Sequence, residues 1–145
     1  MMARRPAIST IINELPKIKK KEEKMLWLRK HDSAPLRQIL RIAYDDERVE
    51  LLIPNTPPPW KKNSYFDVEN MLYGETRRLK IFIRGGGYDN LNPIKRESLF
   101  ISLLEDIDNN DAELLVKMIQ QKPFKGLTHN QLEETFPNIY ETRLV

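Results

Sequence analysis

Hydrophobic residues recur along this chain at spacings of three and four, which is the period of helices that bury one face. The pattern is clearest over residues 35–44, where Leu36, Ile39, Leu40 and Ala43 form one apolar stripe. The same period predicts helices over residues 7–15, 20–31, 67–84, 93–107, 111–119 and 129–136. Gly74 interrupts the 67–84 stretch and marks either a kink or the join of two helices.

Capping residues and glycines mark where several of these helices begin and end. Asn92 followed by Pro93 predicts a helix start, and residues 110–113 and 128–131 both fit a capping box. Gly85-Gly86-Gly87 predicts the end of the helix before it, because consecutive glycines favour left-handed backbone over helix.

Together these elements predict one all-α domain of about six to seven short helices with no substantial sheet. Val49–Ile53 is rich in β-formers but has no obvious strand partner, so we expect an extended segment packed on the helices. The helical module is expected over residues 7–140, between a basic tail at residues 1–6 and a short tail at residues 141–145.

The residue content and spacing of the sequence exclude several kinds of functional site. The absence of cysteine excludes disulfides, zinc–thiolate sites and thiol catalysis. The two histidines, His31 and His129, lack metal-binding spacing, and the acidic clusters at 45–47 and 105–111 are expected to be solvated turns. No stretch approaches the ~20 apolar residues of a membrane span. We expect a soluble, cytoplasmic monomer with no catalytic residue, metal, cofactor or small-molecule substrate.

The charge is unevenly distributed. The net charge is +3, but residues 1–62 hold 14 Lys and Arg against 8 Asp and Glu, whereas residues 63–145 hold 10 against 13. A basic half is compatible with a surface that binds a polyanion. The lysines at positions 17–24 fit equally well as the solvated start of a helix, and both interpretations stay open.

Two turns combine glycine with basic residues. Arg84 precedes the triple glycine, where Gly85 is a candidate for a backbone amide approaching a phosphate. Lys122 and Lys125 lead through Gly126 into the capped start of the last helix, where free amides and the helix dipole favour anions. An ordinary helix terminator and an ordinary interhelical turn explain the same residues.

A proline-rich run, residues 57–60, ends in Trp60. Such a run can be a docking motif for a protein partner through Pro58, Pro59 and Trp60. We favour the alternative, a rigid connector whose tryptophan packs on the core.

Three blocks of sequence resemble a known module. They are Ile12-Asn-Glu-Leu15 with residues 20–30, then residues 36–44 followed by 49–53, then residues 111–119 leading to Gly126 and a helix closed by Phe136-Pro137. In this order they resemble the helical DNA-binding domain that precedes the catalytic core of ATP-dependent DNA ligases, especially the bacteriophage type. The resemblance implies an all-helical domain that holds double-stranded DNA by its phosphates and reads few bases.

Carried over to this sequence, the resemblance makes basic and turn residues the expected DNA contacts: Arg77, Lys80, Arg84, Gly85, Lys122, Lys125, Gly126 and Thr128. The arginines and Lys80 are expected on one helix, with Arg84 four residues after Lys80. Gln121 and Lys122 stand where the family commonly has an Arg-Asp pair. The Lys-x-Asp-Gly motif of ligases is absent, so joining chemistry is not expected.

The expected function is therefore a non-enzymatic protein that binds double-stranded DNA with little sequence specificity. By analogy it is a phage accessory factor, acting in the cytoplasm of the host cell. The alternative is a protein-interaction adaptor that keeps the fold without the DNA face and engages a replication, transcription or host partner.

Overall fold

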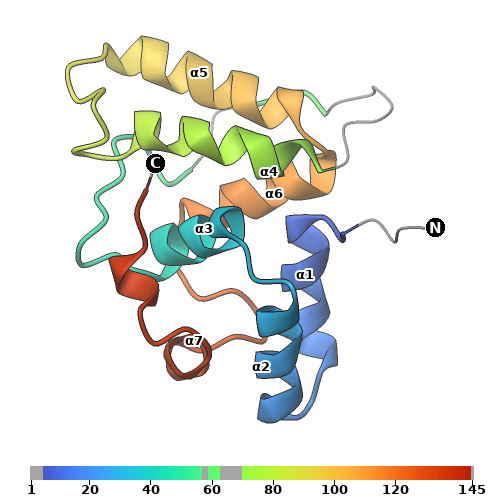
Figure 1. Cartoon of the computed structure of the whole chain (residues 1–145). Helices are drawn as coiled ribbons and strands as arrows, with labels where there is room; N and C mark the ends of the chain where they lie inside the picture. Colours follow the sequence, from blue (N-terminus) through green and yellow to red (C-terminus); the bar gives the residue numbers. More distant parts are fainter. Residues whose placement is uncertain (1–4, 57–58, 63–69, 145) are drawn as a thin grey trace.

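The computed structural model describes residues 5–56, 59–62 and 70–144, and these residues form an all-α fold (Figure 1). In chain order the elements are α1 (Ile8–Glu14), η1 (Leu15–Lys17), α2 (Lys21–Lys30), α3 (Ala34–Tyr44), α4 (Met71–Glu75), η2 (Thr76–Phe82), α5 (Pro93–Asp106), α6 (Asn109–Met118), α7 (His129–Thr135) and η3 (Ile139–Glu141), where η marks 3-10 helices. The predicted fold class is confirmed.

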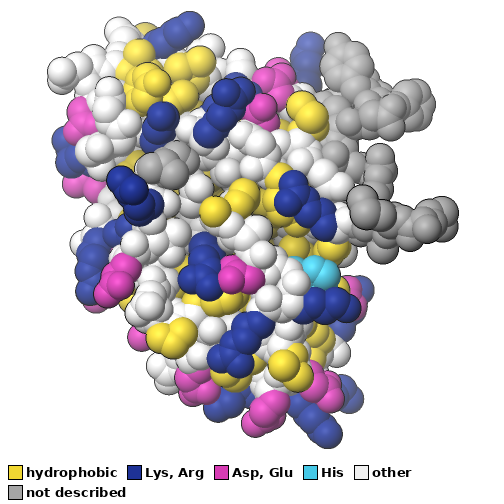
Figure 2. All heavy atoms as spheres, in the orientation of Figure 1, with side chains coloured by type: hydrophobic (Ala, Val, Ile, Leu, Met, Phe, Trp, Pro, Cys, Tyr) yellow, Lys and Arg dark blue, Asp and Glu magenta, His cyan; other side chains and the backbone are white. Residues whose placement is uncertain are grey.

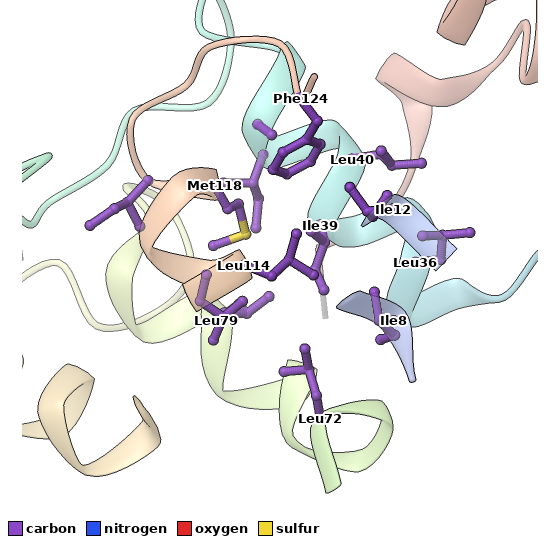
Figure 3. Packing of buried hydrophobic residues seen from close by; sticks show 14 of the residues in the cluster. Ile8, Ile12, Leu36, Ile39, Leu40, Leu72, Leu79, Leu114, Met118 and Phe124 are labelled. Atoms are coloured by element: carbon purple, nitrogen blue, oxygen red, sulfur yellow. The ribbon is translucent and has the colours of Figure 1, made fainter. Parts of the chain in front are cut away.

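Helix α3 is the central element. Ser33 caps its start by accepting a hydrogen bond from the Leu36 amide at 3.2 Å, and its apolar stripe is fully buried. Figure 3 shows Ile39 and Leu40 of α3 among apolar side chains from α1, α6 and the chain that follows α6. One amphipathic helix thus supplies the surface on which the others pack.

The N-terminal helices form a hairpin beside α7. The Trp27 indole donates a hydrogen bond to the Ile11 carbonyl at 2.9 Å and so ties α2 to α1. Arg29 reaches the Thr135 carbonyl at 3.3 Å and ties α2 to α7. Figure 1 shows α2 and α7 at one end of the molecule and α5 at the other.

The helical stretch predicted from residue 67 to Arg84 ends too late, whereas one of the two alternatives left open at Gly74, a join of two helices, agrees with the change from α4 to η2 after Glu75. Residues 63–69 lie outside the described residues; after them come α4 and the 3-10 helix η2, which ends at Phe82. The Arg84 amide then bonds to the Glu50 carbonyl at 3.0 Å, beside an antiparallel bridge between Leu51 and Ile83. The extended segment therefore does have a backbone partner, and this pairing buries Ile83 as it ends the helix.

Two carboxylates expected on solvated turns are buried. Asp111 accepts a hydrogen bond from the Ser9 amide of α1 at 3.0 Å. Close to it, the cap of α6 is Asp108 rather than the predicted Asn110, because the Asp108 carboxylate accepts the Asn110 amide at 3.0 Å. Asp45 is buried beside Arg41 and pairs with it at 3.4 Å. The prediction for Asp111 failed because its partner, Ser9, lies 102 residues away in sequence, which a local pattern does not reveal. The prediction for Asp45 failed because it left out the arginine four residues earlier, a spacing that favours an ion pair.

Both described chain ends pack on the domain. The Tyr73 hydroxyl donates to the Pro6 carbonyl at 2.6 Å, and the Arg5 guanidinium lies 3.4 Å from the centre of the same ring. At the other end, Arg41 donates to the Thr142 carbonyl at 2.6 Å and Leu144 packs against the core. Parts of the two segments predicted as tails therefore contribute to the packed structure.

Asp111 makes folding sensitive to pH. Its side chain is fully buried, and burial raises the pKa of the carboxyl above its ordinary value, although the hydrogen bonds from Ser9 oppose this. A raised pKa means that the folded chain holds the proton more tightly than the unfolded chain. The contribution of Asp111 to stability is complete below the unfolded pKa and is lost as pH rises through the folded value.

Asp111→Asn keeps an acceptor for the Ser9 amide and removes this loss. We expect the variant to become more stable relative to the wild type as pH rises from about 4 to 7. The difference between their free energies of unfolding should grow by about 1.4 kcal/mol for each unit by which folding raises the pKa of Asp111. Urea denaturation at several pH values measures the difference, with Asp46→Asn, at an exposed position, as the control. A difference that stays constant with pH would contradict this account.

Candidate nucleic-acid interface

The loop from Ile119 to Thr128 crosses the C-terminal end of α3 and is anchored there by Tyr44. The buried Tyr44 hydroxyl donates to the Leu127 carbonyl at 2.7 Å and accepts from the Phe124 amide at 2.8 Å. Burial raises the pKa of Tyr44 well above its ordinary value, so the hydroxyl keeps the proton that it donates. One hydroxyl thus pairs two backbone groups of the loop.

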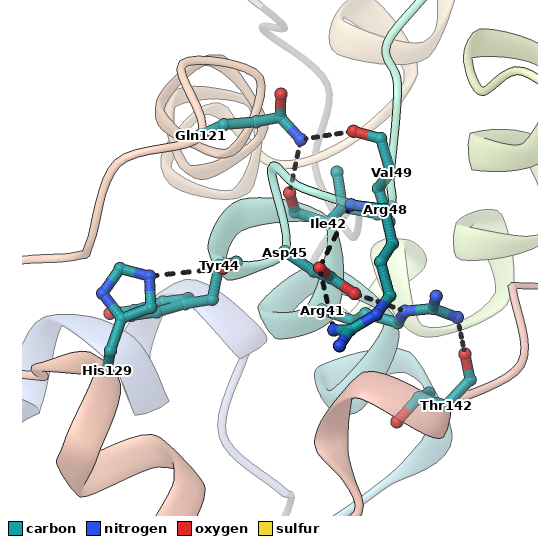
Figure 4. Close-up of polar contacts among 9 residues, drawn as sticks. All are labelled: Arg41, Ile42, Tyr44, Asp45, Arg48, Val49, Gln121, His129 and Thr142. Atoms are coloured by element: carbon teal, nitrogen blue, oxygen red, sulfur yellow. Dashed lines mark hydrogen bonds and ion pairs between the residues drawn. The ribbon is translucent and has the colours of Figure 1, made fainter.

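Side chains from this loop and from the first residue of α7 lie against the end of α3. The last carbonyls of a helix have no partner within it. The Gln121 amide donates to the Ile42 carbonyl at 3.1 Å and to the Val49 carbonyl at 2.9 Å, and His129 Nε2 lies 3.2 Å from the Tyr44 carbonyl oxygen (Figure 4). Gln121, with a left-handed φ of 53°, therefore has a structural role in closing the end of α3.

Gly126 brings the loop against the N-terminal hairpin. Its φ is 88°, and a Cβ there would lie 2.6 Å from the Pro16 nitrogen, so no other residue fits without displacing backbone. The Gly126 carbonyl accepts a hydrogen bond from the Lys24 ammonium at 2.7 Å. Two segments about 100 residues apart in sequence meet at this glycine.

Of the lysines that lie within four residues along the chain of Pro16, Lys24 or Gly126, we name five the Gly126 basic surface: Lys19, Lys20, Lys24, Lys122 and Lys125. Lys20 lies one helical turn before Lys24, at a spacing that puts both on one side of α2. Within the part of the chain that the structure describes, Lys19, Lys20, Lys122 and Lys125 are exposed and form no ion pair. Neighbouring lysines do pair: Lys17 with Glu14 at 3.7 Å and Lys21 with Glu134 at 2.9 Å.

The start of α7 is closed by its own cap. The predicted capping box is confirmed, because Thr128 Oγ1 accepts the Gln131 amide at 3.1 Å and Gln131 Oε1 accepts the Thr128 amide at 3.0 Å. Two of the amides expected to face an anion are therefore occupied. Thr128 and Gly126 support the surface, while the lysines supply its charge.

The other predicted contacts lie elsewhere. Since η2 ends at Phe82, Arg84 is not on a helix face with Lys80, and it forms an ion pair with Glu50 at 2.5 Å. The Gly85 amide donates to the Asp89 carboxylate at 2.9 Å, so the amide expected to meet a phosphate already has an acid as its partner. Arg77 and Lys80 belong to η2, which follows α4 and packs against α5 at the end of the molecule away from α2 and α7 (Figure 1).

The predicted contacts thus fall on more than one surface. Figure 2 shows Lys and Arg side chains interspersed with Asp and Glu across the face in view, rather than gathered into one basic field. Sequence reasoning did not connect the lysines at 19–24 with the 122–128 turn, because neither segment carries a local signal for the other. The glycine and Pro16 reveal the contact only in the folded chain.

Of the favoured interpretation of the proline-rich run, the structure bears out the packing of the tryptophan on the core. Trp60 is half-buried and packs against the core, and Pro59 is exposed. Pro58 lies outside the described residues. The tryptophan is therefore part of the domain's own packing.

Two features are absent from the described residues. No group of three or more histidine or acidic side chains in ranges 5–56, 59–62 and 70–144 is arranged to hold a metal ion. No helix in the same ranges has both the length and the apolar character needed to cross a membrane.

Comparison with known proteins gives a family without an assigned activity. The model of DUF6433, a family of unknown function, matches residues 11–125, and the chain belongs to this family. The matched range begins within α1, includes the hairpin with Lys24, and ends at the loop residue Lys125, one residue before Gly126. No curated protein and no solved structure matches the chain.

Tyr44→Phe tests the anchor of the loop. The change keeps the ring but leaves the buried Phe124 amide and Leu127 carbonyl without partners, which we expect to lower the free energy of unfolding by about 1–3 kcal/mol. Urea denaturation measures this, and Tyr88→Phe is the matched control, because it removes the same hydroxyl from an exposed side chain. Equal stability of the two variants would show that the Tyr44 bonds do not hold the loop.

Proposed function

We propose that this protein binds double-stranded DNA through the phosphate backbone, with little sequence specificity and without catalysing a reaction. The observation that carries the proposal is the convergence of Lys19–Lys24 and Lys122–Lys125 at Gly126. Each segment alone is an ordinary basic turn. Together they form a cationic surface built from two parts of the chain.

The chemistry of the surface favours phosphate over base recognition. Lysine ammonium groups are mobile point charges that attract phosphates without requiring one geometry, whereas base readout requires fixed donor and acceptor patterns in a groove. The backbone that carries Lys122 and Lys125 is nevertheless held in place by Gln121, Phe124 and Gly126. Lysine side chains that are mobile but project from a fixed backbone can reach successive phosphates of a duplex.

The resemblance of the sequence to the ligase-type DNA-binding domain supports the same function. The blocks that carry it include the hairpin around residues 20–30 and the turn at Gly126, which are the two segments of the basic surface. The Lys-x-Asp-Gly motif is missing from the sequence, so we propose binding without strand joining.

Binding should depend steeply on salt. Each phosphate neutralised in a duplex contributes about −0.9 to the slope of log K against log salt, so four lysines that each contact one phosphate predict a slope of about −3 to −4. Fluorescence polarisation of a labelled duplex between about 20 and 200 mM salt measures it. An affinity for the duplex that does not change with salt concentration, or no binding at low salt, would contradict the proposal. Either result would favour a protein partner instead.

Charge reversal locates the surface. Lys122→Glu with Lys125→Glu should reduce duplex affinity at low salt by at least tenfold and reduce the size of the salt slope by about 2, because two phosphate contacts are lost. Lys62→Glu with Lys95→Glu changes the net charge equally at exposed positions outside the surface and is the matched control. Equal losses in both double variants would mean that net charge alone, rather than this surface, attracts the duplex.

A further inference from the structure

A second basic region lies at the other end of the molecule and contains an exposed aromatic ring. An open hollow of about 600 Å³ lies between η2 and the chain after the triple glycine, lined by Glu75, Arg77, Arg78, Lys80, Ile81 and Tyr88. Its volume is in the range of sites that accept small ligands or parts of larger ones. None of the contacts at Gly126 involves these residues.

The position of Tyr88 is fixed by a buried arginine. Arg96 of α5 is only 4% exposed. It donates from Nε to the Ile81 carbonyl at 3.2 Å and from Nη2 to the Tyr88 carbonyl at 2.7 Å. One guanidinium thus joins the end of η2 to the backbone of Tyr88, and a charged group bound in this way is costly to displace.

The triple glycine allows the chain to return to η2. A Cβ at Gly86 would lie 2.0 Å from the Lys80 carbonyl oxygen, which excludes any side chain there. The Gly86 amide bonds back to the Ile83 carbonyl at 3.1 Å. The helix has already ended at Phe82, before the glycines that were predicted to end it, and the triple glycine instead brings an aromatic residue back beside the basic residues of η2.

Two cations at the hollow are available to a ligand. Arg78 is not one of them, because it is 23% exposed and pairs with Glu75 at 3.1 Å and Asp106 at 3.0 Å. Arg77 forms only a long ion pair with Glu75, at 3.8 Å, from a side chain that is 75% exposed, and Lys80 forms no ion pair with any described residue. In a 3-10 helix, residues three apart lie directly above one another, so Arg77 and Lys80 project from the same side.

The ring of Tyr88 is 41% exposed and stacks on no other aromatic ring of the described residues. We infer that this hollow, the Tyr88 site, binds an unpaired nucleotide of a single-stranded nucleic acid, whose base stacks on Tyr88 while its phosphates contact Arg77 and Lys80. Exposed aromatic rings beside cations are how proteins bind single strands without reading sequence. In a duplex the base faces are covered by their neighbours, so the ligand is a strand with free bases.

A free mononucleotide fits less well. Enclosed nucleotide sites cradle phosphates with backbone amides of a glycine-rich loop, and here the Gly85 amide is bound by Asp89. The hollow is open to solvent and offers side-chain charges, which suit a continuous strand. The inference goes beyond the proposed duplex binding and stands on separate residues, so either can fail alone.

The test compares two labelled strands of equal charge by fluorescence polarisation with the full chain: a 12-residue oligothymidine, and a 12-residue strand whose sugars carry no bases. Stacking on Tyr88 predicts that the wild type binds oligothymidine about tenfold more tightly than the abasic strand. Equal affinity for the two strands would overturn the inference without any variant being needed.

Variants then assign the preference. Tyr88→Ala should remove the tenfold preference for oligothymidine, and Tyr88→Phe should retain it. Arg77→Glu with Lys80→Glu should lower the affinity for both strands about tenfold. Lys122→Glu with Lys125→Glu should leave the preference for bases unchanged, because these lysines belong to the duplex surface. If the Tyr88→Ala variant keeps the preference, the bases stack at another position and the inference is wrong. If the same variant loses affinity for a duplex as much as for the single strand, the two sites are not separate.

Discussion

The structure depends on how the carbonyl end of α3 is closed. That end lies inside the domain, where unpaired backbone groups are costly. Gln121 and His129 contact its last carbonyls, and the Tyr44 hydroxyl pairs two backbone groups of the loop that brings them there. The same loop carries Lys122 and Lys125, so the bonds that complete the core also determine where the loop presents charge.

Long-range polar contacts complete this arrangement, and the pattern of apolar residues along the sequence does not predict them. Asp111 ties α6 to α1, Arg41 ties α3 to the C-terminal segment, and Lys24 ties α2 to Gly126. Each joins groups about 100 residues apart in sequence. A helical domain of short elements gains a defined shape from such contacts, because short helices alone have few ways to fix their mutual orientation.

The sequence predicted the helices that carry strong periodicity and local caps, such as α3 with Ser33 and α7 with its Thr128–Gln131 box. It failed where tertiary contacts decide. Residues 83–84 leave the helix because Glu50 and Leu51 offer backbone partners, and Asp111 is buried because Ser9 reaches it. The charge candidates were found residue by residue, but their division between the Gly126 basic surface and the Tyr88 site follows from packing that no local pattern encodes.

The central claim is that lysines from two distant segments act as one duplex-binding surface. Titrating the isotope-labelled protein with a short duplex and following its backbone amides by NMR tests this most directly. The account predicts that signals of residues 19–24 and 122–128 shift together with one affinity, while those of α5 stay unchanged. Shifts confined to one segment, or centred on α5, would contradict it.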